Sequence, residues 1–96
     1  MKAQDWIMTV VNTKNNAVKV YKIFERDENM VKGTIVTLAC HQAQMVFGDI
    51  HAEVEDFDVV PTKDGLQCEV QHTTKDKVII TACPFADLDE FDVDFM

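Results

Sequence analysis

An excess of β-branched residues constrains the fold of this chain more than any other feature of its sequence. It holds 13 valines, 6 isoleucines and 8 threonines, but only 3 leucines. β-Branched side chains lose rotamer freedom in a helix and pack well on a pleated sheet. With 96 residues, of which 47% are hydrophobic, the chain can bury one modest core. We therefore expect a mainly β protein.

Apolar runs separated by turn-forming residues predict about six strands. These are residues 5–11, 17–25, 31–38, 49–60, 66–73 and 77–83. A polar stretch at 12–16 joins the first two strands as a hairpin, and residues 74–76 join the last two. Within 49–60 the apolar alternation slips at Glu55 and Asp56, which predicts a β-bulge there.

One short helix is expected near residues 38–47, between the third and fourth strands. Leu38, Gln42 and Met45 recur at nearly helical spacing, and Gly48 suits a helix C-cap. A continuing strand is the alternative for this segment.

The predicted order of elements fits one of two architectures. Three strands, a short helix and three more strands suit a small, partly open antiparallel β-barrel of the oligonucleotide-binding (OB) type. The alternative is an α+β sheet with one helix. In either case we expect a β-rich domain over residues 1–83, followed by an acidic and apolar C-terminal tail over 84–96.

The acidity of the chain limits the partners that it can attract. Its net charge is −8, from 17 Asp and Glu against 9 Lys and Arg, and residues 84–96 hold five of the acids and no base. Such a charge repels nucleic acid and anionic membranes and attracts basic surfaces.

A cytoplasmic location is expected from two features. The first residues show no signal peptide or membrane span, because Gln4 and Asp5 interrupt the apolar run. The three cysteines, Cys40, Cys68 and Cys83, are odd in number and widely spaced, which indicates free thiols in a reducing compartment.

The sequence offers little for catalysis or metal binding. Its histidines, His41, His51 and His72, form no recognisable nucleophile motif with the cysteines, and its three glycines form no phosphate-binding loop. A zinc site could draw on Cys40, His41, Cys68, His72 and Cys83. Cys68 and His72 have tolerable ligand spacing but would lie about 13 Å apart along a predicted strand. We therefore expect no enzymatic activity, no cofactor and no metal.

Rows of carboxylates are the strongest candidate binding feature. Alternate residues of a strand face the same way at a spacing of about 6.7 Å. A first row is expected from the predicted fourth strand and a second from the tail. The partner-binding candidates are Glu53, Glu55, Asp56, Asp58, Asp87, Asp89, Glu90, Asp92 and Asp94, with Phe91 and Phe95 as apolar anchors. Ordered anions on a rigid frame can imitate a nucleic-acid backbone and engage arginine and lysine side chains.

The end of the chain, DEFDVDFM, resembles the acidic C-terminal tip of single-stranded-DNA-binding proteins. In that family, a run of acids ending in a hydrophobic residue docks into partner repair and replication proteins. The resemblance covers eight to ten residues, and this chain differs by ending in Met96 after Phe95 without a flexible linker. It implies that Asp92, Asp94 and Phe95 bind a partner. From the sequence alone, the tail can equally dock on its own sheet as an edge strand or a short helix.

The leading functional hypothesis is a non-enzymatic acidic interaction protein that inhibits a nucleic-acid-binding partner by occupying its basic surface. Its size and charge match those of small phage- or plasmid-borne inhibitors. The alternative is an OB-like module that binds single-stranded nucleic acid and recruits partners with its tail. In that case, stacking and phosphate contacts would come from Trp6, Lys14, Lys19, Tyr21, Lys22 and Phe24. Exposed strand edges and the apolar tail also allow a homodimer.

Overall fold

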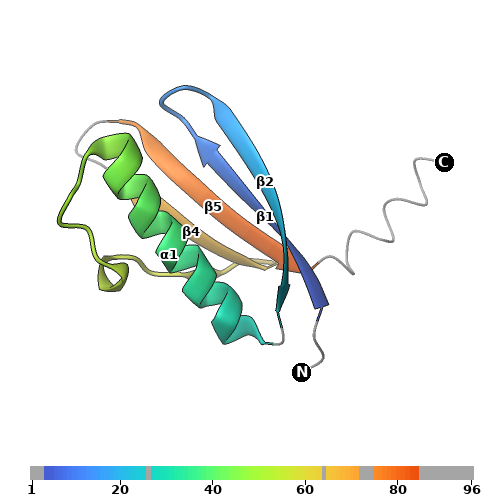
Figure 1. Ribbon diagram of the computed structural model, residues 1–96. Helices are drawn as coiled ribbons and strands as arrows, with labels where there is room; N and C mark the ends of the chain where they lie inside the picture. The colour runs from blue at the N-terminus through green and yellow to red at the C-terminus, as the bar shows by residue number, and fades with distance from the viewer. Residues whose placement is uncertain (1–3, 26, 64, 72–74, 85–96) are drawn as a thin grey trace.

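The computed structural model describes residues 4–25, 27–63, 65–71 and 75–84 of the chain. These residues form one open, antiparallel five-stranded sheet and one long α-helix (Figure 1). The strands are β1 (Gln4–Asn12), β2 (Ala17–Glu25), β3 (Val60–Pro61), β4 (Leu66–Gln71) and β5 (Lys77–Pro84). Their order across the sheet is β2-β1-β5-β4-β3, so β2 and β3 form its two edges.

Both predicted hairpins are confirmed. β1 and β2 pair over their full length, from Gln4 opposite Glu25 to Asn12 opposite Ala17. The turn between them is built by asparagines: the side chain of Asn12 accepts from the Lys14 amide at 2.9 Å, and Asn16 adopts a positive φ of 59°. In the second hairpin, β4 pairs with β5 from Leu66 opposite Ala82 to Gln71 opposite Lys77.

The sheet is not closed, so the predicted barrel is not confirmed, and the structure describes five strands rather than six. One reason is that the predicted third strand, 31–38, is wrong. These residues lie within helix α1 (Glu28–Phe47), which is twice as long as the short helix expected near 38–47. The observed architecture is therefore mainly β, with one open sheet and one helix, as in the α+β alternative.

The side chains of α1 explain why its first half is helical despite its β-branched residues. Val31, Ile35, Ala39 and Ala43 recur every four residues and are all buried against the sheet. The hydroxyl of Thr34 donates to the Met30 carbonyl four residues earlier, at 3.1 Å, so it is satisfied within the helix. The helical spacing of the buried residues outweighs the strand propensity that the prediction relied on.

Both ends of α1 are capped. Asp27 is the N-cap, and its Oδ1 accepts from the amides of Asn29 and Met30 at 2.6 and 3.2 Å. At the other end, Gly48 takes the left-handed conformation, with φ of 69°, and its amide donates to the Gln44 carbonyl. The prediction of Gly48 as the helix terminator is confirmed.

The predicted fourth strand over 49–60 is wrong except for Val60. Residues Val54–Asp56 form a short 3₁₀-helix, η1, and the bulge expected at Glu55 and Asp56 does not occur. Asp56 stabilises this turn locally, because its Oδ2 accepts from the Glu53 amide at 3.0 Å and its own amide donates to the Glu53 carbonyl at 2.9 Å. Short acidic side chains thus satisfy the backbone here without a sheet partner.

The core lies between α1 and one face of the sheet. Alternate residues of three strands point into it. They are Trp6, Met8 and Val10 from β1, Leu66, Cys68 and Val70 from β4, and Val78, Ile80 and Ala82 from β5. The helix contacts mainly β4 and β5, and contacts β2 less. The part of the chain that the structure describes contains no helix that could cross a membrane.

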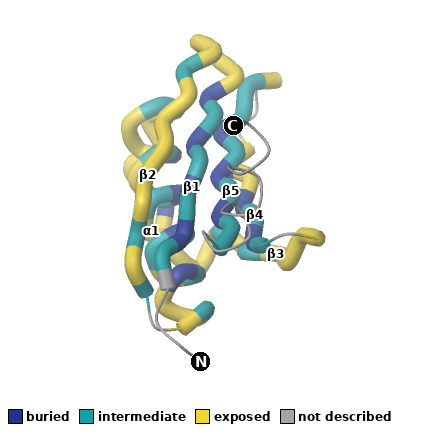
Figure 2. The backbone as a smooth tube through the Cα atoms, turned by 90° about the vertical axis from the view of Figure 1, so that its right-hand side faces the viewer, coloured by how far each residue is buried: buried dark blue, intermediate teal, exposed yellow. Residues whose placement is uncertain are grey.

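No helix of the described residues covers the opposite face of the sheet, and β2 is the most exposed of the four longer strands. Figure 2 shows β2 exposed along most of its length, whereas buried residues alternate with intermediate ones in β1 and β5, and with intermediate or exposed ones in β4. β5 includes Pro84. The rest of the predicted tail, 85–96, lies outside the described residues.

Candidate functional site

The acidic candidates of the predicted fourth strand lie instead in the connection from α1 to β3. Glu53, Glu55, Asp56 and Asp58 are all exposed, but they follow a 3₁₀-turn and a loop rather than a strand. The prediction that they form a straight row on a pleated strand is therefore wrong. Their physical arrangement is a curved acidic segment at the β3 side of the molecule.

Three carboxylates nevertheless converge on one shallow groove. Asp56 and Asp58 reach it from the loop, and Glu69 reaches it from β4. The groove has a volume of about 310 Å³, and the amide side chains of Gln67 and Gln71 lie along it. We call this feature the acidic groove. It combines anionic acceptors with neutral amides that can donate or accept hydrogen bonds.

The negative charges of the acidic groove affect the pKa of a buried thiol. Cys68 lies beneath it on β4 and is buried. Burial, and then the negative charges of Asp58 and Glu69, raise the pKa of the Cys68 thiol above its ordinary value. The thiol therefore stays protonated at neutral pH, which makes it a packing residue and a poor nucleophile.

The acidic segment from residue 49 to residue 60 has little positive charge to neutralise it. Residues 49–60 hold five acids and no Lys or Arg. Within the described residues, Glu69 forms an ion pair with Lys77, Nζ to Oε1 at 3.3 Å, and no ion pair is found for the acids of 49–58. These carboxylates therefore remain available to cations from outside the molecule.

The cysteines and the described histidines do not assemble a catalytic or metal centre. Cys40 lies on α1, where its Sγ donates to the Ala52 carbonyl at 3.2 Å, and Cys83 lies on β5. His41 and His51 are exposed on the helix and in the following loop. No three His, Cys, Asp or Glu side chains among the described residues are placed to hold a metal ion, and His72 lies outside those residues.

The residues proposed to stack on single-stranded nucleic acid are not brought together. Trp6 is buried on the helix side of the sheet, so its ring cannot stack on a base. Tyr21 shares that side, whereas Phe24 and Lys22 project from the opposite face, as the strand alternation requires.

The basic candidates are equally dispersed. Lys22 forms an ion pair with Asp5 at 3.3 Å. Lys19 lines a hollow on the helix side, and Lys14 lies in the hairpin turn.

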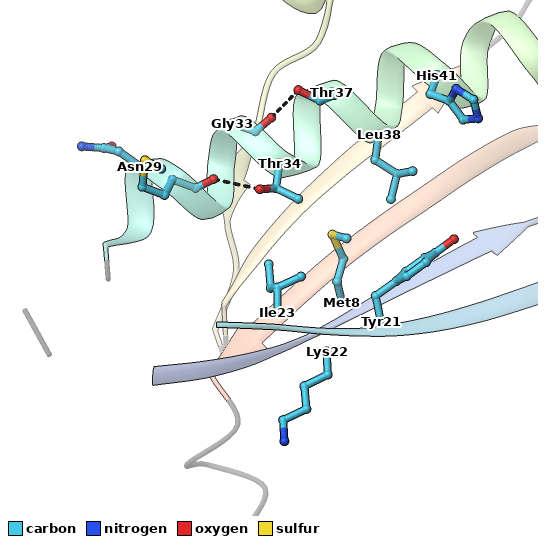
Figure 3. Close-up of a pocket in the computed structure, with 11 residues that line it drawn as sticks. Met8, Tyr21, Lys22, Ile23, Asn29, Gly33, Thr34, Thr37, Leu38 and His41 are labelled. Atoms are coloured by element: carbon cyan, nitrogen blue, oxygen red, sulfur yellow. Dashed lines mark hydrogen bonds between the residues drawn. The ribbon is translucent and has the colours of Figure 1, made fainter. Parts of the chain in front are cut away.

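A second groove, which the sequence prediction missed, separates α1 from the edge strand β2. It has a volume of about 790 Å³, and its lining is mostly apolar. Figure 3 shows Met8, Tyr21 and Ile23 pointing up from the strands and Leu38 pointing down from the helix, while Lys22 points away on the other side of the sheet. We call this feature the β2–α1 groove.

The β2–α1 groove extends along most of the helix. A smaller hollow of about 250 Å³ continues it towards the hairpin turn, and His41 lines both. Gly33 lines the helix side of this groove, and a Cβ added there would meet nothing within 4 Å. The signal available in the sequence was that neither face of 17–25 is cleanly polar: Val18, Val20 and Phe24 share one face, and Tyr21 and Ile23 share the other.

The tail candidates have no described position. Asp87, Asp89, Glu90, Phe91, Asp92, Asp94 and Phe95 all lie outside the described residues.

Comparison with known proteins adds no family to this description. No protein-family model, no curated protein and no solved structure matches the chain.

Proposed function

We propose that this protein is a non-enzymatic interaction protein that presents carboxylates to a basic surface of another protein. The observation that carries the proposal is the acidic groove, where Asp56, Asp58 and Glu69 converge beside two glutamine side chains. It opens next to a loop that holds five acids and no Lys or Arg. The net charge of −8 adds long-range attraction for basic partners.

The groove chemistry suits arginine and lysine side chains. A guanidinium can donate two parallel hydrogen bonds to one carboxylate, and neighbouring carboxylates and amides can accept its remaining protons. Basic side chains of this kind line the nucleic-acid-binding surfaces of proteins. In the version that we favour, the protein inhibits a nucleic-acid-binding protein by occupying that surface, as a phage- or plasmid-borne inhibitor would.

The proposed place of action is the cytoplasm, which agrees with the free thiols of Cys40, Cys68 and Cys83. We also propose that the protein forms a homodimer, which is supported by its exposed edge strand β2.

A fluorescent arginine-rich peptide tests the acidic groove directly. The variant Asp56→Asn/Asp58→Asn/Glu69→Gln removes three groove carboxylates and should weaken peptide binding by about tenfold or more, as measured by anisotropy. The matched control Asp89→Asn/Asp92→Asn/Asp94→Asn removes the same charge from the tail. Equal losses of peptide affinity in both variants would show that binding depends only on net charge and not on the acidic groove. A loss in the control alone would move the site from the groove to the tail.

Two further measurements separate this function from its alternative. Partner capture should weaken as salt rises, and free DNA or RNA should release a nucleic-acid-binding protein that the immobilised protein has retained from extracts of its own host cells. Tight binding of a fluorescent single-stranded oligonucleotide by the protein itself would instead support the single-strand-binding module. Capture that is indifferent to salt would contradict the carboxylate proposal.

A further inference from the structure

The edge strand β2 offers an unusually apolar and accessible surface. In the described sheet it pairs only with β1, so its outer edge leaves backbone amides and carbonyls without a strand partner. Val18, Val20 and Phe24 are 59%, 64% and 64% exposed on one face, and Tyr21 is 37% exposed on the other. A long, apolar, unpaired edge of this kind is a template for pairing with another strand.

We propose that two copies of this chain join through β2, strand against strand and antiparallel, about a two-fold axis that passes Tyr21. The two five-stranded sheets then form one continuous sheet, with both helices on the same face. The occupant of the edge is thus the same edge of a second copy, which is the isologous contact that a two-fold dimer requires.

The register follows from the strand itself. Tyr21 is the middle residue of the nine-residue strand Ala17–Glu25. Placing it opposite its own copy pairs every residue of β2, and the exposed apolar side chains then meet. Val18 lies opposite Phe24 of the second copy, and Val20 lies opposite Lys22, whose aliphatic stem can cover it. On the helix side, Tyr21 faces Tyr21.

Neighbouring registers are less favourable. Centring the pair on Lys19 or Lys22 sets two lysines directly opposite each other, which is destabilising. Centring it on Val20 places Phe24 beyond the end of the partner strand, opposite the hairpin turn. A shift by a single residue does not fit two identical edges, because it would set helix-side residues opposite residues of the other face, whereas directly opposite residues of an antiparallel pair point to the same side.

The β2–α1 groove gives the dimer a second contact region. Tyr21 and Ile23 line this groove and lie on the helix side of β2, next to the new strand pair. In the dimer, each groove borders the Tyr21 ring of the second copy, and the two grooves become one channel floored by the β2 strands. Met8, which is already buried, and Leu38 form its inner wall, and Leu38 then loses further contact with water.

The charge distribution permits this contact despite the acidity of the chain. Residues 4–25 hold three lysines against two acids, whereas the whole chain carries −8. The β2 edge is therefore a part of the surface where two copies repel each other least. Because added salt screens the remaining net repulsion, it should strengthen the dimer, which is the opposite of its effect on binding a basic partner.

A charge-swap at Tyr21 tests both the dimer and its register. In sedimentation velocity, the full chain should have twice the mass of one chain. The variants Tyr21→Lys and Tyr21→Glu each place two like charges opposite each other on the axis, so each should dissociate about tenfold more readily. An equimolar mixture of the two should recover the wild-type affinity, because lysine then faces glutamate.

Ile50→Lys is the control, since Ile50 is 78% exposed in the loop after α1 and lines neither the β2–α1 groove nor its continuation, and it should leave the dimer intact. Circular dichroism checks that each variant is folded. Three results would overturn the proposal: a wild-type protein that stays monomeric at all concentrations, Tyr21 variants that still dimerise, or a mixture that fails to recover. A monomer whose β2 amides exchange slowly would identify the chain's own C-terminal segment as the occupant. The peptide-binding assay is independent of these outcomes, because Tyr21 does not line the acidic groove.

Discussion

The two edges of the sheet differ in length, charge and protection. β2 is nine residues long, has exposed apolar residues on both faces and contains Lys19 and Lys22, while β3 is two residues long, includes Pro61 and adjoins the acidic loop. A short edge with a proline is a poor template for strand pairing, because proline donates no hydrogen bond. The comparison indicates that the β2 edge is suited to pairing through the backbone, and the β3 edge to recognition through charged side chains.

The largest loss of stability should come from a substitution at Gly65, in the turn between β3 and β4. A Cβ at this position would collide with the backbone carbonyl of Ala82 on β5, so neither the glycine nor its neighbour can relax cheaply. Gly65→Ala should lower the free energy of unfolding by about 3 kcal/mol. Urea unfolding followed by the fluorescence of Trp6, the single tryptophan, would measure it.

Gly48→Ala is the informative companion, because it strains a left-handed residue that has open space around it. It should cost about 1 kcal/mol, clearly less than Gly65→Ala. Equal losses in the two variants would contradict the proposed clash at Gly65, because they would show that β5 moves aside at little cost.

An intermediate effect should appear with pH, through the buried thiol under the acidic groove. Since folding raises the pKa of Cys68 above the usual 9.0, the folded state holds this proton more tightly than the unfolded state. The stability that this proton provides is complete below pH 9.0 and is lost as pH rises through the folded pKa. The loss is about 1.4 kcal/mol per pH unit between the two values.

Neutralising one carboxylate of the acidic groove tests whether its charge contributes to this pH dependence. Asp58→Asn removes one of the charges that raise the pKa of Cys68, so the alkaline loss of stability should be smaller in this variant. Tyr21→Lys, at the other edge, should leave it unchanged. Urea midpoints measured at several alkaline pH values would compare the three proteins, and identical curves for Asp58→Asn and wild type would contradict the electrostatic coupling.

The smallest effect is expected in the wall of the β2–α1 groove. Gly33 lies inside α1 with free space beside it, so Gly33→Ala should raise the free energy of unfolding by about 0.5–1 kcal/mol through helix propensity alone. Thermal unfolding would detect the gain. A loss of stability would show that the position is packed more tightly than the structure indicates.

The hairpins were predictable because their signals are local. The asparagine-rich turn after β1 and the alternation of β4 and β5 each depend on a few neighbouring residues, and all four strands of the two hairpins form where expected. The helix was half missed because Val31 and Ile35 have strand propensity, and only their four-residue spacing to Ala39 and Ala43 shows the buried face. Strand propensity and helical periodicity disagreed there, and the segment forms the helix that the periodicity indicates.

The candidate sites were less predictable for a different reason. The acidic groove needs Glu69 of β4 beside Asp58 of the loop, and the β2–α1 groove needs helix and strand residues far apart in sequence. Neither pairing has a local signature, so the sequence predicted the abundance of carboxylates and apolar residues but not where they meet. The straight row over 49–60 failed because Asp56 caps its own turn.

The position of β5 in the sheet has a consequence for how this protein is made. Among the described strands it is the last to leave the ribosome, yet it lies between β1 and β4 and contributes Val78, Ile80 and Ala82 to the interior. Until it emerges, the nascent β1–β2 hairpin has no central neighbour, and α1 has only a partial surface to pack on. Assembly is therefore expected to wait until β5 has left the ribosome, and its rate should be limited by the long-range search that joins β1 to β5.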